Sequence, residues 1–231
     1  MQKYIRLALP ALFLILCACA PAKPGVTGDP ARDHFLGKEY GKMTQVPGHP
    51  ERLAWRKLGV DPKRYTAVLL DKTVVWQATA IARESGVSPE ELSALAAYFD
   101  QVLAKTMGSI AFPIATEAGP HVMRISTAIT WVRPSNPTMN TISSVMPVGM
   151  LMTLGRKASG AADPNVGACS MEFRFSDAAT GESIGLFADH VEGDKYDTAN
   201  FEKFGQAEKA MDQWVERMRE GILKNWGARK D

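Results

Sequence analysis

Few residues in this 231-residue chain have the types and spacings that chemistry requires. The four histidines, His34, His49, His121 and His190, form no i, i+4 pair and no zinc-type spacing with a cysteine, so we expect no metal site. Gly181-Glu182-Ser183-Ile184-Gly185 matches Gly-x-Ser-x-Gly in letters only, because it falls in an expected hairpin and not on the strand-to-helix turn of a nucleophile elbow. No Gly-x-x-x-x-Gly-Lys precedes Ser or Thr. The sequence therefore predicts no catalytic residue, no metal ligand and no cofactor.

Three further polar groups have structural explanations. Cys169 alternates with apolar residues, which favours a buried, inert thiol over a nucleophile. Asp189 and His190 are neighbours near the end of an expected strand, so their side chains point to opposite faces and cannot readily act together. Arg124 lies within another expected strand, where it either pairs with Glu172 across the sheet or binds a ligand.

The covalent chemistry that the sequence does predict lies at its N-terminus. Lys3 and Arg6 precede an apolar run over residues 7–18, which is the arrangement of a secretory signal peptide. The run is too short to span a hydrocarbon core, because a spanning helix takes about 20 apolar residues. Leu16-Cys17-Ala18-Cys19 resembles a bacterial lipobox, in which the cysteine after the cleavage site receives acyl chains. We therefore expect cleavage just before Cys19 and lipidation of its thiol.

Cys19 is a better acceptor than Cys17, because small Ala18 precedes it whereas bulky Leu16 precedes Cys17. An ordinary signal peptide with incidental cysteines and a plain membrane anchor are the alternatives. Ala20, rather than Asp, follows the acceptor, as in lipoproteins destined for the outer membrane. Several acyl chains, at roughly 0.8 kcal/mol per buried methylene, hold a protein on a bilayer. The expected location is the outer membrane, with the protein lipid-anchored and facing the periplasm.

The mature chain is electrically balanced. The full chain has 27 Lys and Arg against 25 Asp and Glu, and Lys3 and Arg6 leave with the leader. Without excess positive charge there is no electrostatic basis for binding nucleic acid. With Cys17 removed and Cys19 acylated, Cys169 is the last free thiol, so no internal disulfide is expected. The fold must therefore depend on its apolar core.

The chain divides into a signal peptide (residues 1–18), a Pro- and Gly-rich flexible tether (19–32) and a single periplasmic domain (33–231). Glycine and proline break residues 33–62 into irregular structure. Six large apolar residues could still pin that segment onto the domain: Phe35, Leu36, Tyr40, Leu53, Trp55 and Leu58.

Regular patterns follow from residue 65 onward. Strands are expected over residues 67–70, 73–76, 121–132, 169–175 and 182–191, the last two joined by a turn at 177–181. A capping box of Ser88 and Glu91 begins a helix that ends near Gly108, and a second amphipathic helix runs from about residue 207 to 226. In residues 121–132, five residues are expected to share one face: Met123, Ile125, Thr127, Ile129 and Trp131.

This order predicts an α+β fold: a mainly antiparallel sheet of four or five strands with two long helices packed on one face. The almost continuously apolar stretch at Val145–Leu154 fits a buried strand or short helix, and alternatively a membrane-facing or partner-facing patch. Burial is the favoured interpretation of that stretch.

The chain resembles domain-of-unknown-function family 3313, a group of bacterial envelope lipoproteins. The matching pieces are the lipobox at Cys19, the segments 65–71, 74–76, 119–120 and 124–130, the segment 171–181 with Asp189, and the helix around Trp214. The family carries no established activity, so the resemblance implies none for any residue here. The element order also looks like that of small periplasmic lipoprotein domains that act as accessory or assembly factors, a likeness of topology alone.

Three functions are compatible with these observations. The first is a non-catalytic, lipid-anchored domain that binds another envelope protein or assists assembly, with the membrane as its second partner. The second is a small-molecule or lipid-binding module that uses Met150–Leu154 as a pocket wall. The third and weakest is an envelope hydrolase, since no paired acids or nucleophile–base spacing is visible.

Replacing Cys19 with serine removes the acyl acceptor, so Cys19→Ser is expected to remain unprocessed and to lose most of its lipid-dependent recovery with membranes. Cys17→Ser is the matched control and should be processed and fractionated like the parent. The measurement is the size and distribution of the protein after fractionation of cell envelopes. Equal processing of Cys19→Ser and the parent would contradict the assignment.

Overall fold

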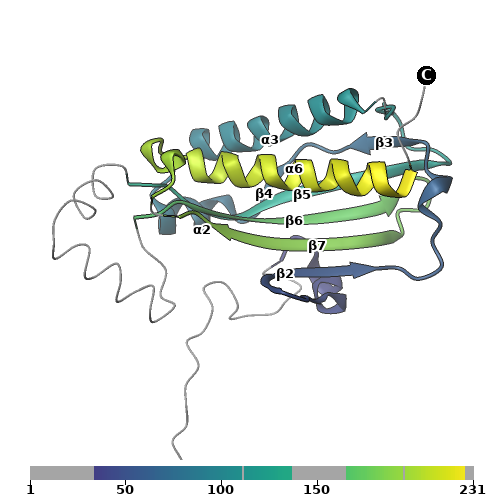
Figure 1. Ribbon diagram of the computed structural model, residues 1–231, viewed down its shortest axis with the longest axis horizontal. Coiled ribbons are helices and arrows are strands. Elements are labelled where there is room, and N and C mark those ends of the chain that lie inside the picture. Colours follow the sequence, from purple (N-terminus) through teal and green to yellow (C-terminus); the bar gives the residue numbers. More distant parts are fainter. Residues whose placement is uncertain (1–33, 111, 137–164, 195, 227–231) are drawn as a thin grey trace, which may run out of the picture.

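The computed structural model describes residues 34–110, 112–136, 165–194 and 196–226 (Figure 1). Its elements are η1 (Gly37–Lys42), β1 (Thr44–Val46), β2 (His49–Arg56), η2 (Pro62–Arg64), β3 (Ala67–Leu70), β4 (Val74–Val75), α2 (Ala78–Ser85), α3 (Pro89–Ser109), β5 (Val122–Arg133), β6 (Ala168–Asp177), β7 (Ser183–Glu192), η3 (Thr198–Phe201) and α6 (Gly205–Trp226). Each η is a 3₁₀ helix. Cys19, the tether and Val145–Leu154 lie outside the described residues.

The strands form one seven-stranded sheet in the order β1-β2-β7-β6-β5-β3, with β4 also paired to β5. β3 and β4 run parallel to β5, and the other pairs are antiparallel. The α+β class and the mainly antiparallel sheet are confirmed, whereas the prediction of four or five strands is wrong. The main error lies in residues 33–62, where Gly48, at φ 78°, helps form the tight turn between β1 and β2. The residues expected to break structure there instead build a hairpin.

Two long helices, α3 and α6, lie side by side over one face of the sheet (Figure 1). The predicted capping box starts α3: Ser88 Oγ accepts from the Glu91 amide at 3.2 Å, and the Glu91 carboxylate accepts from the Ser88 amide at 3.0 Å. Phe173 of β6 joins both helices to the sheet, since its ring centroid lies 6.0 Å from that of Phe99 on α3 and 6.0 Å from that of Trp214 on α6. The main core lies between these two layers.

The segment 34–43 covers part of the opposite face. Glu172 on β6 points to that face and is 3% exposed. One of its carboxylate oxygens lies 2.8 Å from His34 Nδ1, and the other accepts from the Leu36 amide at 2.9 Å. A second apolar cluster surrounds this contact: Phe35, Leu36, Tyr40, Met43, Leu53, Trp55, Leu186 and Ala188. Five of the six predicted pinning residues are therefore confirmed.

The exception is Leu58, whose side chain is 93% exposed. Leu58 and Gly59, at φ 76°, form the turn that follows β2. This turn leaves the sheet before the chain enters η2, so Leu58 has no core to join.

A β-bulge changes the predicted alternation in β5. The pairing with β6 shifts between Ile129 and Trp131, so Thr130 is the extra residue. Val132 consequently joins the main core, and Trp131 lies opposite Ser170 and within ring contact of His190, on the other face. The prediction that Trp131 shares a face with Met123 is therefore wrong, because a bulge adds one residue to a two-residue period.

The carboxylate of Asp189 on β7 connects β2, β7 and α6 on the helix-covered side of the sheet. Its side chain is fully buried. One oxygen accepts hydrogen bonds from Arg52 Nε on β2 at 3.1 Å, Trp214 Nε1 on α6 at 2.8 Å and Arg217 on α6 at 3.0 Å. A buried charge is tolerated only with such compensation, so these donors determine how α6 sits against β2 and β7.

Asp189→Ala leaves two guanidinium groups without their shared acceptor. We expect it to lower the free energy of unfolding by about 3–5 kcal/mol, the usual effect of breaking a buried ion pair. Glu216→Ala is the control: it breaks an exposed pair with Arg219 on the same helix and should barely move the urea midpoint. Equal midpoints for the two variants would contradict the role of Asp189.

Candidate functional site

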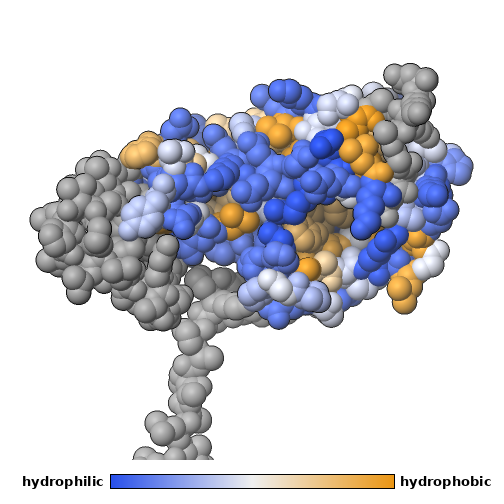
Figure 2. Space-filling view, viewed as in Figure 1, coloured by the Kyte–Doolittle hydropathy of each residue, from blue (hydrophilic) through white to orange (hydrophobic). Residues whose placement is uncertain are grey.

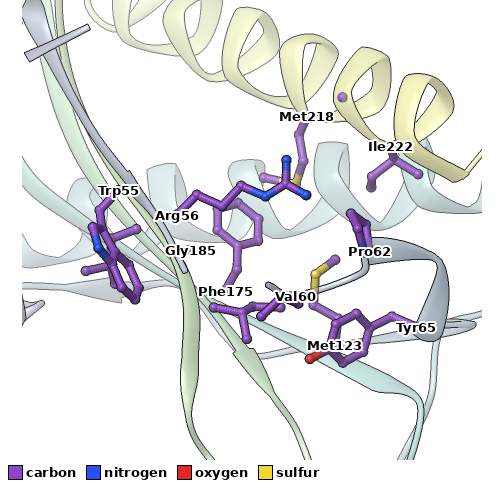
Figure 3. A pocket seen from close by; sticks show the side chains of 13 residues that line it. Trp55, Arg56, Val60, Pro62, Tyr65, Met123, Phe175, Gly185, Met218 and Ile222 are labelled. Atoms are coloured by element: carbon purple, nitrogen blue, oxygen red, sulfur yellow. The ribbon is translucent and has the colours of Figure 1, made fainter. Parts of the chain in front are cut away.

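An apolar cleft lies between the C-terminal half of α6, the adjoining parts of β5, β6 and β7, and the turn between β2 and η2 (Figure 3). Its volume is about 280 Å³. The lining residues are Trp55, Arg56, Val60, Pro62, Tyr65, Met123, Phe175, Ile184, Gly185, Leu186, Met218, Gly221 and Ile222. Arg56 is the one charged residue among them, so the cleft suits an apolar group.

Glycines on both walls keep the cleft open. Gly185 of β7 lies opposite Phe175 of β6. The residue before it, Ile184, is the extra residue of a β-bulge in β7. A Cβ at Gly185 would lie 3.5 Å from the Phe175 ring and 3.8 Å from the Trp55 carbonyl oxygen, both ordinary contact distances. Gly221 lies on the α6 wall and has no atom within 4 Å of a Cβ placed there. The space therefore results from missing side chains rather than from strained packing.

The mouth of the cleft carries a cation. Arg56 extends from the end of β2 toward α6 (Figure 3), and among the described residues it has no ion-pair partner, whereas the adjacent Lys57 pairs with Glu182. Leu58, two residues beyond Arg56, is almost fully exposed. Figure 2 shows apolar surface in the hollow between α6 and β2, bordered by hydrophilic residues.

The histidines occupy separate sites. Each described ring has its own partner: His34 with Glu172, His49 with Glu51 at 3.2 Å, His121 with the Arg64 carbonyl at 2.9 Å, and His190 with Ser170 at 2.8 Å. In residues 34–110, 112–136, 165–194 and 196–226, no three His, Cys, Asp or Glu side chains gather as metal ligands. No helix in these same ranges is both long and apolar enough to cross a membrane.

Cys169 is buried, as predicted, and burial raises the pKa of its thiol to about 12. The thiol therefore stays protonated near neutral pH and is a poor nucleophile. The predicted separation of Asp189 and His190 is also confirmed: Asp189 binds Trp214 on the helix-covered face, whereas His190 binds Ser170 on the other. Burial lowers the pKa of His190, which favours its neutral form.

Arg124 does not pair with Glu172, so that prediction is wrong. Its Nε donates to both carboxylate oxygens of Asp71, at 2.9 and 2.8 Å. The reason is register: Arg124 lies opposite Ser176, whereas Glu172 lies opposite Ala128, four residues farther along β5. Arg124 instead lines a second, polar hollow.

Sequence reasoning did not identify the apolar cleft, because its walls come from segments far apart in the chain. Met218 and Ile222 lie on the helix that was predicted to be amphipathic, and Gly185 and Gly221 were not singled out. An isolated glycine within a strand pattern is a sign of a bulge or a close approach, so Gly185 was the available signal. Cys19 and Met150–Leu154, the other predicted sites, lie outside the described residues.

Comparison with known proteins gives one family and a distant structural likeness. Two solved structures of a PelC dodecamer from Paraburkholderia phytofirmans, one of them a Leu-to-Met variant, align over 78% of this chain and 99% of theirs, with 10% and 9% identity and TM-scores of 0.41 and 0.40. No curated protein matches. A family model described as "Protein of unknown function (DUF3313)" matches residues 31–218. Since that match spans most of the sequence, the chain belongs to domain-of-unknown-function family 3313, as its motifs predicted.

Proposed function

We propose that this chain is a lipid-anchored, periplasm-facing protein of the outer membrane that binds an apolar group of another envelope protein and catalyses no reaction. The observation that carries the proposal is the open apolar cleft between α6, β7 and the β2–η2 turn. Solitary exposed leucines are common. The apolar residues that line the cleft instead form one surface bordered by hydrophilic residues, which is the usual form of a docking site.

The cleft can supply useful binding energy without any polar contact. Each buried methylene contributes about 0.8 kcal/mol, and the ring of Phe175 offers a large rigid wall. Acylation at Cys19 would confine the domain to the membrane surface, where a modest affinity suffices because the effective concentration of envelope partners is high.

The described side chains favour binding over catalysis. The thiol of Cys169 is buried with a raised pKa, and the histidines lie in separate environments, each with a partner of its own. The cleft itself is lined by one charged side chain, Arg56, and no carboxylate. Tyr65, the other titratable residue of the lining, donates its hydroxyl to Asp177 at 3.2 Å, and burial raises its pKa, so it stays a neutral phenol and is a poor general base near neutral pH.

Arg56 favours a second candidate, a lipid- or small-molecule-binding module. A cation at the mouth of an apolar cleft matches an amphiphile with an anionic head and a hydrocarbon tail. A protein partner would instead present an apolar side chain, with Arg56 at the rim of the interface.

Filling the cleft should abolish partner binding. Gly221→Leu adds a side chain on the α6 wall, while Gly108→Leu adds the same side chain to α3, away from the cleft, where a Cβ also meets no atom within 4 Å. Leucine favours a helix over glycine, so both variants should fold. In mildly crosslinked envelopes, the partner adduct of the parent is expected with Gly108→Leu and not with Gly221→Leu. Adducts that are equal in all three, or absent from the parent, would contradict the proposal.

An apolar anionic dye separates the two candidates. If the cleft binds amphiphiles, 1-anilinonaphthalene-8-sulfonate should fluoresce on the parent, and dodecanoate should displace it. Arg56→Gln should then weaken dodecanoate binding several-fold, whereas Lys57→Gln, one residue farther along, should not. Partner crosslinking without any dodecanoate binding supports the protein-docking function, and the reverse result supports the lipid-binding module.

A further inference from the structure

A second hollow, of about 330 Å³, lies on the face of the sheet opposite to α3 and α6. We call it the arginine groove. It is lined by Phe35, Asp71, Lys72, Val74, Arg124, Ser126, Thr127, Arg174, Ser176, Ala178 and Gly181. Three of these residues are cationic, and each has a carboxylate partner: Asp71 for Arg124, Glu39 for Arg174 and Asp100 for Lys72.

Four of the lining residues form the corners of a rectangle on two neighbouring strands. Arg124 of β5 lies opposite Ser176 of β6, and Ser126 of β5 lies opposite Arg174 of β6. The two arginines therefore occupy one diagonal and the two serines the other. Diagonal neighbours in an antiparallel pair lie about 7–8 Å apart, so two guanidinium groups can reach one small ligand between them.

Arg124 is held in place by its Nε atom alone. Nε donates to both oxygens of Asp71, and the same carboxylate accepts from Ser126 Oγ. Asp71 is available for this role because β3 ends at Leu70 and pairing with β5 resumes only at Val74. The terminal nitrogens of Arg124 have no acceptor among the described residues, and a fixed guanidinium fork of this kind matches a carboxylate or phosphate.

Arg174 is positioned by contacts with the segment 34–43, including an ion pair with Glu39. Its guanidinium lies 5.4 Å from the Phe35 ring centroid, and it donates to the Leu36 carbonyl oxygen at 3.4 Å. Its buried Nε forms an ion pair with Glu39 at 3.3 Å, without the geometry of a hydrogen bond. With both Nε atoms turned toward carboxylates of the protein, the terminal nitrogens of the two guanidinium groups are the atoms that an oxyanion near the centre of the rectangle would meet.

We propose that the arginine groove binds the carboxylate or phosphate group of a small anionic ligand. The guanidinium groups of Arg124 and Arg174 contact the anion, and Ser176 lies at a third corner as a hydroxyl donor. Ser126 at the fourth corner donates its proton to Asp71 and so helps to hold Arg124. Lys72, whose side chain is 92% exposed, lies at the edge and pairs with Asp100 at 3.5 Å. The proposal concerns the face opposite to the apolar cleft and is independent of the cleft's function.

The test is a titration of the full-length lipidated protein, labelled with ¹⁵N, in a neutral detergent. Inorganic phosphate and glucuronate are added separately at constant ionic strength set with chloride, and the side-chain Nε–Hε resonances are followed. Saturable shifts of Arg124 and Arg174 with either anion support the proposal, and the anion that binds more tightly identifies the class. Absence of saturable shifts with both would overturn it, as would a response only to vesicles containing phosphatidylglycerol, since that result indicates a membrane surface.

Arg124→Gln and Arg174→Gln should each weaken anion binding at least tenfold. Arg219→Gln is a matched control, because Arg219 Nε also donates to both oxygens of one carboxylate, that of Glu216, but on α6. Ala178→Phe fills the groove while keeping both arginines, and should abolish binding even where an arginine variant folds poorly. Unchanged binding in both groove arginine variants, or an equal loss in Arg219→Gln, would overturn the assignment.

Discussion

The two-residue period of the central strands is the constraint on which the rest of the structure depends. In β6, Cys169, Met171 and Phe173 point into the core beneath α3 and α6, so Ser170, Glu172 and Arg174 must point to the other face. One face therefore becomes a packed interior and the other a row of polar groups. On that polar face, Glu172 binds the segment 34–43, and Arg174 lines the arginine groove. Without a disulfide in the described residues, this division of faces, with the buried carboxylate of Asp189, organises the layers.

Local signals predicted the elements well, and long-range pairing accounts for what was missed. The capping box at Ser88 and the alternation in β6 are properties of a few adjacent residues, and both are confirmed. The partner of Arg124 depended on a register that no local pattern contains, and the correct partner, Asp71, belongs to a strand break rather than to a strand. The bulge at Thr130 is a similar case, because an inserted residue is visible only when the opposite strand is known.

The candidate sites were harder to predict than the fold. One depends on side chains that are missing, and the other depends on residues that only strand pairing brings together. The apolar cleft exists where Gly185 and Gly221 leave space, and a missing side chain has no pattern of its own. The arginine groove required Arg124 and Arg174, fifty residues apart in the chain, to become diagonal neighbours. Together they give the domain two chemically different hollows on opposite sides of one sheet, one lined mainly by apolar residues and the other bearing two arginines.

The hydrogen-bonded contact of Glu172 with His34 and the Leu36 amide has a mechanical consequence. If the protein hangs from a membrane by its N-terminus, any pulling force reaches the described domain first at this contact, on β6 in the middle of the sheet. The load is then shared with β5 and β7 on either side. A tether that entered through an edge strand such as β1 would instead peel one strand away, so this point of entry protects the domain from being unzipped.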